Sequence, residues 1–397
     1  MRGGVREGSG RKTISPEKKK KCKNIYLTDD LIQEINQINK NTAYTFSKKC
    51  VRLIEIGISQ LRKTSCAAEN GSVAASGYTV KDAVDSYQLT FIDLFAGIGG
   101  IRKGFEDADT KCVFSSEWDK FAAKTYEANY GEVPFGDITK INAADIPDHD
   151  VLLAGFPCQP FSNIGKREGF AHETQGTLFF DVLRILQEKQ PKMFLLENVS
   201  GLLTNDQGNT FRVIINALEK LKYSIFYKLL DAQNFGLPQR RKRVVIVGFR
   251  EDMHVTDFDI PEGDESLRVP VKDILEHNPK GYTISKHLQS SYLFKRDDGK
   301  PQLIDFNSNI QVNTLCASYH KIQRLTGTFV KDGATGIRLY SELECKRLMG
   351  FSDDFAVPVS RTQMYRQFGN SVAVPMIKAV ADEMKKALRK SISNRVM

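Results

Sequence analysis

The chain has 397 residues, roughly two to three times the length of a typical single domain, which excludes a small peptide module. Its residues are 41% hydrophobic and 26% charged, so they can bury a core and cover its surface; neither wholesale disorder nor a collagen-like repeat fits. The formal charge of +9 favours a polyanionic partner, because bound cations release counterions from phosphates.

The cysteines and the apolar runs limit the cellular setting. The seven cysteines lie far apart and none forms a Cys-x-x-Cys pair, so we expect no metal site and no disulfide framework. No apolar run approaches the ~20 residues needed to cross a bilayer, and the basic N-terminus leads into polar sequence. We therefore expect a soluble cytoplasmic protein with no membrane partner.

The N-terminal region divides into a basic arm and a small module. Residues 1–22 are rich in Gly, Arg and Lys, which predicts a disordered arm or a merely solvated tail. Residues 23–63 predict a strand and two amphipathic helices, a unit too small to bury its apolar stripes without a second copy. The unit resembles a ribbon-helix-helix DNA-binding domain, which implies a dimer whose strand presents Asn24 and Tyr26 to bases. The alternative is a small helical dimerisation appendage.

After a linker at 64–88, the remaining sequence predicts an α/β domain with a smaller one inserted. Between residues 89 and 251, apolar β-type runs alternate with helical stretches, which is typical of a doubly wound, mostly parallel sheet covered on both faces. The runs are Phe91–Leu94, Val113–Ser116, Val151–Ala154, Met193–Leu196 and Val244–Phe249. Residues 252–335 lose the alternation and predict a small irregular domain. Helical periodicity returns in residues 336–390, which we expect to complete the first domain.

A glycine-rich turn follows the first of these strands. The run from Phe91 to Gly100, Phe-Ile-Asp-Leu-Phe-Ala-Gly-Ile-Gly-Gly, places the turn between a strand and a helix, where a ligand can approach the backbone closely. Glu117 follows Gly97 by 20 residues, an offset that suits binding of ribose hydroxyls, and Trp118 beside it could stack on adenine. A tight turn without ligand is the alternative. The spacing of the glycines fits S-adenosylmethionine better than a dinucleotide.

A cysteine, a carboxylate and two arginines are expected at the same edge of the sheet. Cys158 lies in a proline-flanked loop after Val151–Ala154, and Glu197 ends the next strand. Arg241 and Arg243 precede the last strand and alternate onto one face. Ligands of doubly wound sheets bind at the carboxyl edge, so this group is a candidate catalytic site.

The chain resembles the DNA cytosine-5 methyltransferases over about Leu89 to Leu388. The matching motifs, which occur in the family's order, are Asp93–Gly100, Glu117–Trp118, Gly136–Ile138, Gly155–Ser162, Glu197–Val199, Gln239–Arg243, Arg338–Phe351 and Gln367–Val372. The resemblance implies an S-adenosylmethionine-dependent methyltransferase fold, and it makes residues 252–335 the target-recognition domain.

The resemblance also implies a role for each catalytic candidate. Cys158 adds to ring carbon 6 of cytosine, Glu197 hydrogen-bonds ring nitrogen 3, Arg243 holds the exocyclic oxygen and Arg241 positions the loop of Cys158. A base inside a duplex cannot present carbon 6 to a side chain, so the target cytosine must flip out.

Two further sets of residues follow from the resemblance. The cofactor set comprises Phe95, Gly97, Ile98, Gly99, Gly100, Glu117, Trp118, Asp137, Ile138, Pro157, Asn370 and Val372. The DNA set comprises Ser162, Lys166, Arg167, Gln239 and Thr314, besides Asn24 and Tyr26 of the N-terminal module. Gln175 stands where many relatives have a phosphate-holding arginine, which implies a weaker clamp or phosphate contact through Lys166 or Arg167.

These inferences predict a double-stranded DNA methylase from a prokaryote or phage, nucleoid-associated and monomeric on DNA apart from a dimeric N-terminal module. We expect the modification enzyme of a restriction-modification system, with a cognate endonuclease as functional partner and autoregulation of its own gene through the N-terminal module. Two alternatives stay open: methylation of cytosine in RNA, and a role mainly as a DNA-binding transcriptional regulator.

Overall fold

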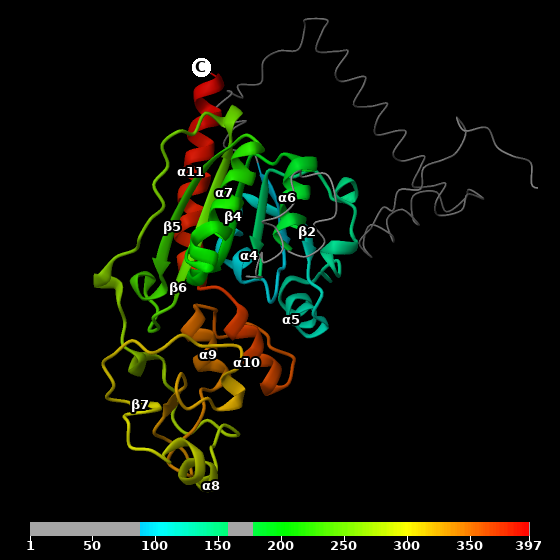
Figure 1. Cartoon of the computed structure of the whole chain (residues 1–397). Coiled ribbons are helices and arrows are strands. Elements are labelled where there is room, and N and C mark those ends of the chain that lie inside the picture. The colour runs from blue at the N-terminus through cyan, green and yellow to red at the C-terminus, as the bar shows by residue number, and fades with distance from the viewer. Residues whose placement is uncertain (1–87, 158–177, 397) are drawn as a thin grey trace, which may run out of the picture. The chain divides into compact units, whose positions relative to one another are not determined.

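The computed structural model describes residues 88–157 and 178–396 (Figure 1). Several predicted residues lie outside this part, so the structure does not test their placement: Asn24, Tyr26, Cys158, Ser162, Lys166, Arg167 and Gln175. The basic arm, the strand-helix-helix module and almost all of the linker also lie outside it.

A six-stranded sheet in the order β2-β1-β3-β4-β6-β5 is the centre of the fold. Its strands are β1 (Leu89–Leu94), β2 (Thr110–Ser116), β3 (Val151–Gly155), β4 (Met193–Val199), β5 (Tyr223–Asp231) and β6 (Lys242–Arg250). The first four strands are parallel, whereas β6 runs antiparallel to both of its neighbours. The predicted mostly parallel sheet is confirmed, but the sequence analysis missed β5.

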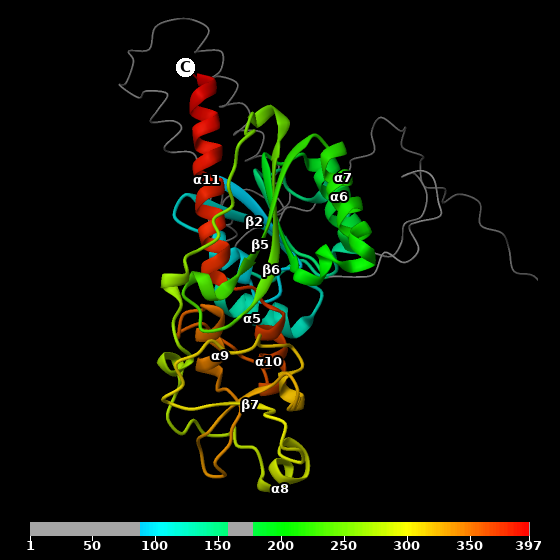
Figure 2. The ribbon, with the colours of Figure 1, turned by 60° about the vertical axis from the view of Figure 1, so that its left-hand side comes forward.

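Helices cover both faces of the sheet, as Figure 2 shows. Helices α4 (Gly100–Phe105) and α11 (Val374–Val396) share one apolar core with Phe91 and Leu153 of the sheet. Helices α6 (Leu178–Lys189) and α7 (Asn209–Lys220) share another with Ile92 and Leu152, the strand neighbours that point the opposite way. Burial on both faces explains why these strands read as continuous apolar runs. Helix α5 (Lys120–Tyr130) begins at its cap, Asp119, beside the end of β2.

The chain after β6 has little regular structure. It contains β7 (Gln302–Ile304) and β8 (Thr328–Val330), which pair in parallel, and the helices α8 (Lys286–Leu288), α9 (Glu342–Met349) and α10 (Arg361–Asn370). This part of the chain also has short 3-10 turns at Glu251–Met253, Glu265–Leu267, Val271–Ile274 and Tyr319–Lys321, and a π turn at Gln289–Leu293. Further 3-10 turns before β6 lie at Ile138–Lys140, Ala143–Asp145, Ser200–Leu203, Asn205–Gly208 and Ala232–Phe235. A third apolar core joins β7, β8, α9 and α10.

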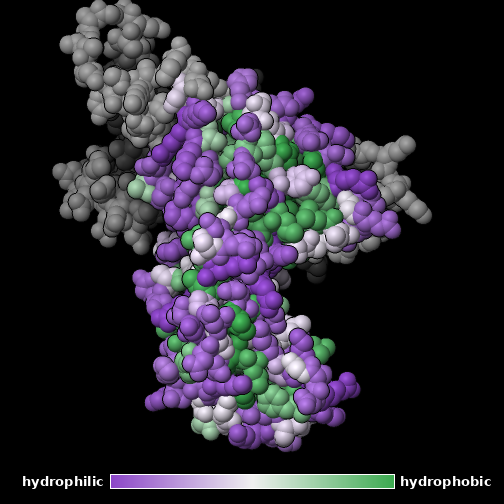
Figure 3. Space-filling model, turned by 90° about the vertical axis from the view of Figure 1, so that its left-hand side faces the viewer, coloured by the Kyte–Doolittle hydropathy of each residue, from purple (hydrophilic) through white to green (hydrophobic). Residues whose placement is uncertain are grey.

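The surface of the described residues is mainly polar. Figure 3 shows one face on which hydrophilic side chains predominate and hydrophobic ones gather in smaller areas. Among residues 88–157 and 178–396, no helix combines the length and the apolar character that a membrane crossing requires.

Candidate active site

The glycine turn after β1 is held by a carboxylate from the end of β2. Gly97 and Gly99 have φ angles of +56° and +80°, and Phe95 has +54°, so three residues of the turn adopt the left-handed conformation that favours glycine. The N–H of Gly97 donates to Oε2 of Glu117 at 2.7 Å, and Oε1 of that carboxylate accepts from the N–H of Asp119 at 2.7 Å. The two features that the sequence places 20 residues apart therefore meet.

A pocket of roughly 220 Å³ opens beside this turn. Its lining residues are Phe95, Ser116, Glu117, Trp118, Asp137, Ile138, Thr139 and Leu178. Trp118 is 76% exposed, so its indole face is free for a ring to stack, whereas Glu117 is buried and its pKa is raised by that burial. Aromatic faces beside a carboxylate suit the adenine and ribose of a nucleoside, so the residues present fit S-adenosylmethionine. Ser116, Thr139 and Leu178 are lining residues that the sequence analysis missed.

The C-terminal segment packs on the same turn. A Cβ added to Gly100 would lie 2.5 Å from Oγ of Ser371 and 3.0 Å from Cγ2 of Val372, so only glycine fits this close approach. Asn370, at the end of α10, is exposed, and neither it nor Val372 lines the pocket. The side chain of Ile98 is buried in the third apolar core, so only its backbone is left for the predicted cofactor contact.

Asp137 and Pro157 complete the predicted cofactor set. Asp137 caps the turn Ile138–Lys140, and its Oδ1 accepts from Oγ1 and the N–H of Thr139 at 2.8 and 3.1 Å. These hydrogen bonds hold the pKa of Asp137 below its usual range, so this pocket carboxylate is an ionised acceptor. Pro157 is exposed and does not line the pocket.

Tyr130 anchors the opposite side of the turn, a role that no sequence pattern indicated. Its hydroxyl donates to the carbonyl oxygen of Gly99 at 2.7 Å, and a Cβ added to Gly99 would lie 2.3 Å from its ring. The guanidinium of Arg102 lies 4.2 Å from the centre of the Tyr130 ring, within the range of a cation–π interaction. Tyr130 thus fixes the backbone of the glycine turn at Gly99.

The candidate catalytic group lies where β3 and β4 end together. Gly155, the last residue of β3, pairs with Glu197 of β4. The side chain of Asn198 donates to the carbonyl oxygen of Phe156 at 2.8 Å, which holds the chain two residues before Cys158. Cys158 itself lies outside the described residues. The sequence analysis gave Asn198 no role, although it stands next to Glu197 in the quoted motif.

Arg243 reaches Glu197 because β6 runs antiparallel to β4. This direction places the first residues of β6 at the carboxyl end of β4, where Arg243 pairs with Val199. Nε of Arg243 lies 3.0 Å from Oε1 of Glu197, so the two side chains form an ion pair. The pair lacks the alignment of a hydrogen bond, and among the described residues the buried Oε1 of Glu197 has no hydrogen-bond donor. Burial raises the pKa of Glu197, and the charges of Arg243 and Arg241 oppose the rise.

Arg241 is 1% exposed and serves as a buried connector. Its guanidinium donates to the carbonyl oxygens of Leu315 and Gly369, each at 3.1 Å, and to that of Ser371. It therefore joins the segment after β7 to the segment that packs on the glycine turn. Its expected contact with the loop of Cys158 involves residues outside the described part.

Gln239, a predicted DNA contact, is buried in the structure. It is 0% exposed; its amide nitrogen donates to the carbonyl oxygen of Leu348, and its amide oxygen accepts from the N–H of Leu315 at 3.2 Å. Thr314 is half-buried, and its hydroxyl donates to the carbonyl oxygen of Arg240 at 2.6 Å. Gln239 therefore holds the backbone next to Thr314, and its contact with DNA stays a prediction.

The fold and the site together define a class. A doubly wound sheet with a nucleoside-sized pocket at its first glycine turn, and a buried Glu–Arg pair at its next carboxyl edge, is the arrangement of a methyltransferase. The model of the C-5 cytosine-specific DNA methylases matches residues 89–386, and the chain belongs to this family. It is a DNA (cytosine-5) methyltransferase, and this family and fold depend on S-adenosylmethionine in general.

Relatives of similar length support this membership. The chain is 65% identical over 402 residues to the type II methyltransferase M.BsuFI of Bacillus subtilis, covering 98% of each chain. It is 56% identical over 310 residues to the type II methyltransferase M.MspI of Moraxella sp, covering 78% of this chain and 73% of that one. A crystal structure of a Spodoptera frugiperda DNMT2 mutant shares the fold at 20% identity, with a TM-score of 0.61 over 76% of this chain and 99% of that one.

Proposed function

We propose that this enzyme transfers a methyl group from S-adenosylmethionine to carbon 5 of a flipped-out cytosine in a specific duplex sequence. We also propose that it is the modification enzyme of a type II restriction-modification system with a cognate endonuclease, because its relatives carry the type II name. The observation that carries the proposal is the buried Glu197–Arg243 pair beside the strand end that leads to Cys158.

Cys158 is the proposed nucleophile. Cytosine is a poor carbon nucleophile, and a thiolate is the protein group best suited to add to its ring carbon 6 near neutral pH. Addition forms the sulfur–carbon 6 bond and moves an electron pair toward ring nitrogen 3, which gives carbon 5 enamine character. S-adenosylmethionine, when bound, supplies an electrophilic methyl group to that carbon. Loss of the carbon 5 proton then restores the ring double bond and expels Cys158.

Glu197 and Arg243 are the proposed partners of the base. Burial raises the pKa of Glu197, which favours the protonated acid that can give its proton to ring nitrogen 3 as the thiolate adds. Its Oε1 has no aligned hydrogen-bond donor among the described residues, which leaves its hydrogen-bonding capacity unused until a base enters the site. The Arg243 guanidinium lies beside this carboxyl, in position to hold the exocyclic oxygen and stabilise developing negative charge.

The proposed cofactor site is the pocket beside the glycine turn. Glu117 would accept from the ribose hydroxyls and Asp137 from the adenine amino group, while Phe95 and Trp118 offer faces to the ring. Glu117 also accepts from the N–H of Gly97, so the carboxylate that would hold the ribose is itself held by the glycine turn.

The domain boundaries given above remain predictions, and so does the regulatory role of residues 1–63. We propose that 23–63 forms a dimeric operator-binding module joined through 64–88 to the methylase, and that 252–335 reads the target sequence. A fragment that begins near Ser86 should keep most of its methylation activity, whereas fragment 1–63 should dimerise and bind a palindromic sequence.

Bisulfite sequencing of DNA from cells that express the enzyme tests the proposal, with Cys158→Ala as the matched inactive variant. The expected result is 5-methylcytosine at one short sequence in the wild type only. Protection of scattered cytosines, or none, contradicts it. Tritium transfer from labelled S-adenosylmethionine to duplex DNA and to transfer RNA separates DNA from RNA methylation.

A further inference from the structure

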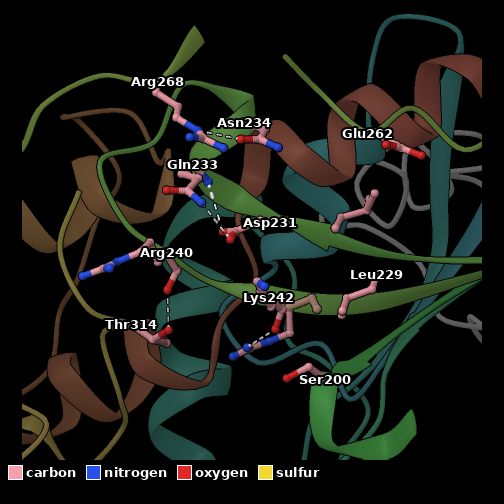
Figure 4. Close-up of a pocket in the computed structure, with 12 residues that line it drawn as sticks. Ser200, Leu229, Asp231, Gln233, Asn234, Arg240, Lys242, Glu262, Arg268 and Thr314 are labelled. Atoms are coloured by element: carbon pink, nitrogen blue, oxygen red, sulfur yellow. Dashed lines mark hydrogen bonds between the residues drawn. The ribbon is translucent and has the colours of Figure 1, made fainter. Parts of the chain in front are cut away.

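A second and larger groove, of roughly 600 Å³, lies at the end of the β5–β6 hairpin (Figure 4). We call it the hairpin groove; its lining residues are Ser200, Leu229, Leu230, Asp231, Gln233, Asn234, Arg240, Lys242, Arg243, Glu262, Arg268 and Thr314. Because Arg243 lines it and also pairs with Glu197, the hairpin groove adjoins the catalytic pair. The cofactor pocket shares no lining residue with it.

The two acids of the hairpin groove are already engaged. Asp231 accepts from the N–H of Arg241 at 3.0 Å and from the side-chain amide of Gln233 at 2.9 Å, contacts that Figure 4 shows in part. Glu262 forms an ion pair with Lys228 at 2.9 Å. Four cations line the same groove, so its net charge is positive.

Two of the four cations form no ion pair with a carboxylate in the described part of the chain. Arg268 pairs with Glu265 and donates to Asn234, and Arg243 pairs with Glu197. In contrast, the Arg240 side chain makes one long hydrogen bond of 3.4 Å with the Asn313 side chain, and the exposed Lys242 ammonium forms no hydrogen bond or ion pair with another described residue. Arg240 and Lys242, two exposed cations separated by one residue, are therefore available to a ligand.

The backbone that carries these cations is fixed, which is a requirement for a binding site. The hydroxyl of Thr314 donates to the carbonyl oxygen of Arg240, and the N–H of Arg240 donates to the carbonyl oxygen of Val312 at 2.9 Å. Lys242 is the first residue of β6 and pairs with Asp231. Only the side chains of Arg240 and Lys242 remain to be ordered when an anion binds.

We propose that the hairpin groove binds the sugar–phosphate backbone of DNA on one flank of the target cytosine, with Arg240 and Lys242 each contacting a phosphate. The inference rests on the proposed function and adds contacts that position the duplex without reading its bases. An open, polar groove with unpaired cations beside the catalytic pair suits a polyanion that passes through the site better than a small enclosed ligand.

The test compares the salt dependence of DNA binding by the full-length wild type and by Arg240→Ala/Lys242→Ala. The probe is a fluorescent duplex of about 30 base pairs that carries the methylated sequence, and anisotropy gives its affinity. Each lost phosphate contact lowers the slope of log affinity against log salt by about 0.9. The slope should therefore fall by about 1.8, and the ratio of wild-type to variant affinity should be about twelvefold larger at 50 mM than at 200 mM salt.

Two kinds of control keep the result specific. Lys378→Ala/Lys386→Ala removes the same charge from exposed positions on α11, outside the groove, and should leave the slope at the wild-type value. The charge-preserving Arg240→Lys/Lys242→Arg should keep the slope as well. Lys242→Gln alone, at an exposed position, should lower the slope by about 0.9 even if the double variant does not fold.

The inference is wrong if the folded groove variants keep the wild-type slope of log affinity against log salt. It is also wrong if the α11 control loses as much of that slope as the groove variants do. The loss should be the same for a duplex of scrambled sequence, because phosphate contacts carry no sequence information. A loss confined to the methylated sequence would mean base readout and would also overturn it. If the wild type neither binds nor methylates DNA, the proposed function itself is wrong. This outcome differs from a wild type that methylates DNA while the groove variants keep its salt dependence, which contradicts only the groove inference.

Discussion

Asp93 offers a direct test of the electrostatics beneath the glycine turn. This β1 residue is 1% exposed, and neither of its carboxyl oxygens has a hydrogen-bond partner among the described residues. Burial raises the pKa of Asp93 to about 8; Arg102 opposes the rise and Glu117 adds to it. The group is therefore largely protonated in the folded enzyme at pH 7 and ionised in the unfolded chain.

This difference makes stability depend on pH with a defined sign. Between pH 4 and 8 the unfolded chain binds about one proton fewer at Asp93 than the folded enzyme, so stability is present at low pH and is lost as pH rises. The loss is about 1.4 kcal/mol per pH unit, or roughly 3 kcal/mol from pH 5 to pH 7. Asp93→Asn has nearly the same shape and does not titrate, so it should lack this dependence.

Urea unfolding followed by far-ultraviolet circular dichroism measures the effect, because the single tryptophan, Trp118, is already exposed in the folded enzyme. The free energy of unfolding of the wild type minus that of Asp93→Asn should fall by roughly 3 kcal/mol between pH 5 and pH 7. Asp148→Asn is the matched control, because it removes a carboxylate whose side chain is 97% exposed instead of buried. A wild-type minus Asp93→Asn difference that is constant with pH would refute the reasoning.

Three further predictions follow from the site. Tyr130→Phe removes the hydrogen bond to the Gly99 carbonyl, which is worth about 1–2 kcal/mol. Titration calorimetry should therefore find that the variant binds S-adenosylmethionine about tenfold more weakly. An unchanged affinity would exclude a positioning role for Tyr130. Glu197→Gln cannot give its proton to the base and should slow methyl transfer about 10²- to 10⁴-fold in single-turnover assays while DNA still binds; near-normal transfer would remove Glu197 from the mechanism. A chimera that takes residues 252–335 from a relative of different specificity and stays active should methylate a different sequence, which bisulfite mapping would identify. An unchanged target sequence would place recognition outside residues 252–335.

The sequence predicted those parts of the fold that follow from local pattern. The apolar runs that became β1, β3 and β4 are buried on both faces, so their signal is strong. The helix after Ser341 was expected, and its capping box forms between Ser341 and Glu344. In contrast, β5 mixes half-exposed and buried positions without a regular alternation, which explains why its pattern was missed.

The site depended on features that local pattern cannot show. If β6 were parallel to β4, Arg243 would lie at the opposite edge of the sheet from Glu197; the antiparallel direction brings the two together. Gln239 precedes a run of four basic residues, and no local pattern shows that its amide is buried against Leu315. The contact of Tyr130 with the glycine turn joins a helix end to a strand end, and no spacing rule predicts it.

The most direct test of the central claim is covalent trapping of the nucleophile. A duplex with 5-fluorocytosine at the methylated position should form a denaturation-resistant adduct with the wild type in the presence of S-adenosylmethionine, because fluorine cannot leave as the carbon 5 proton does. Peptide mapping should place the adduct on Cys158, and Cys158→Ala should form none. An adduct on another cysteine, or its absence in an enzyme that methylates the ordinary duplex, would contradict the account.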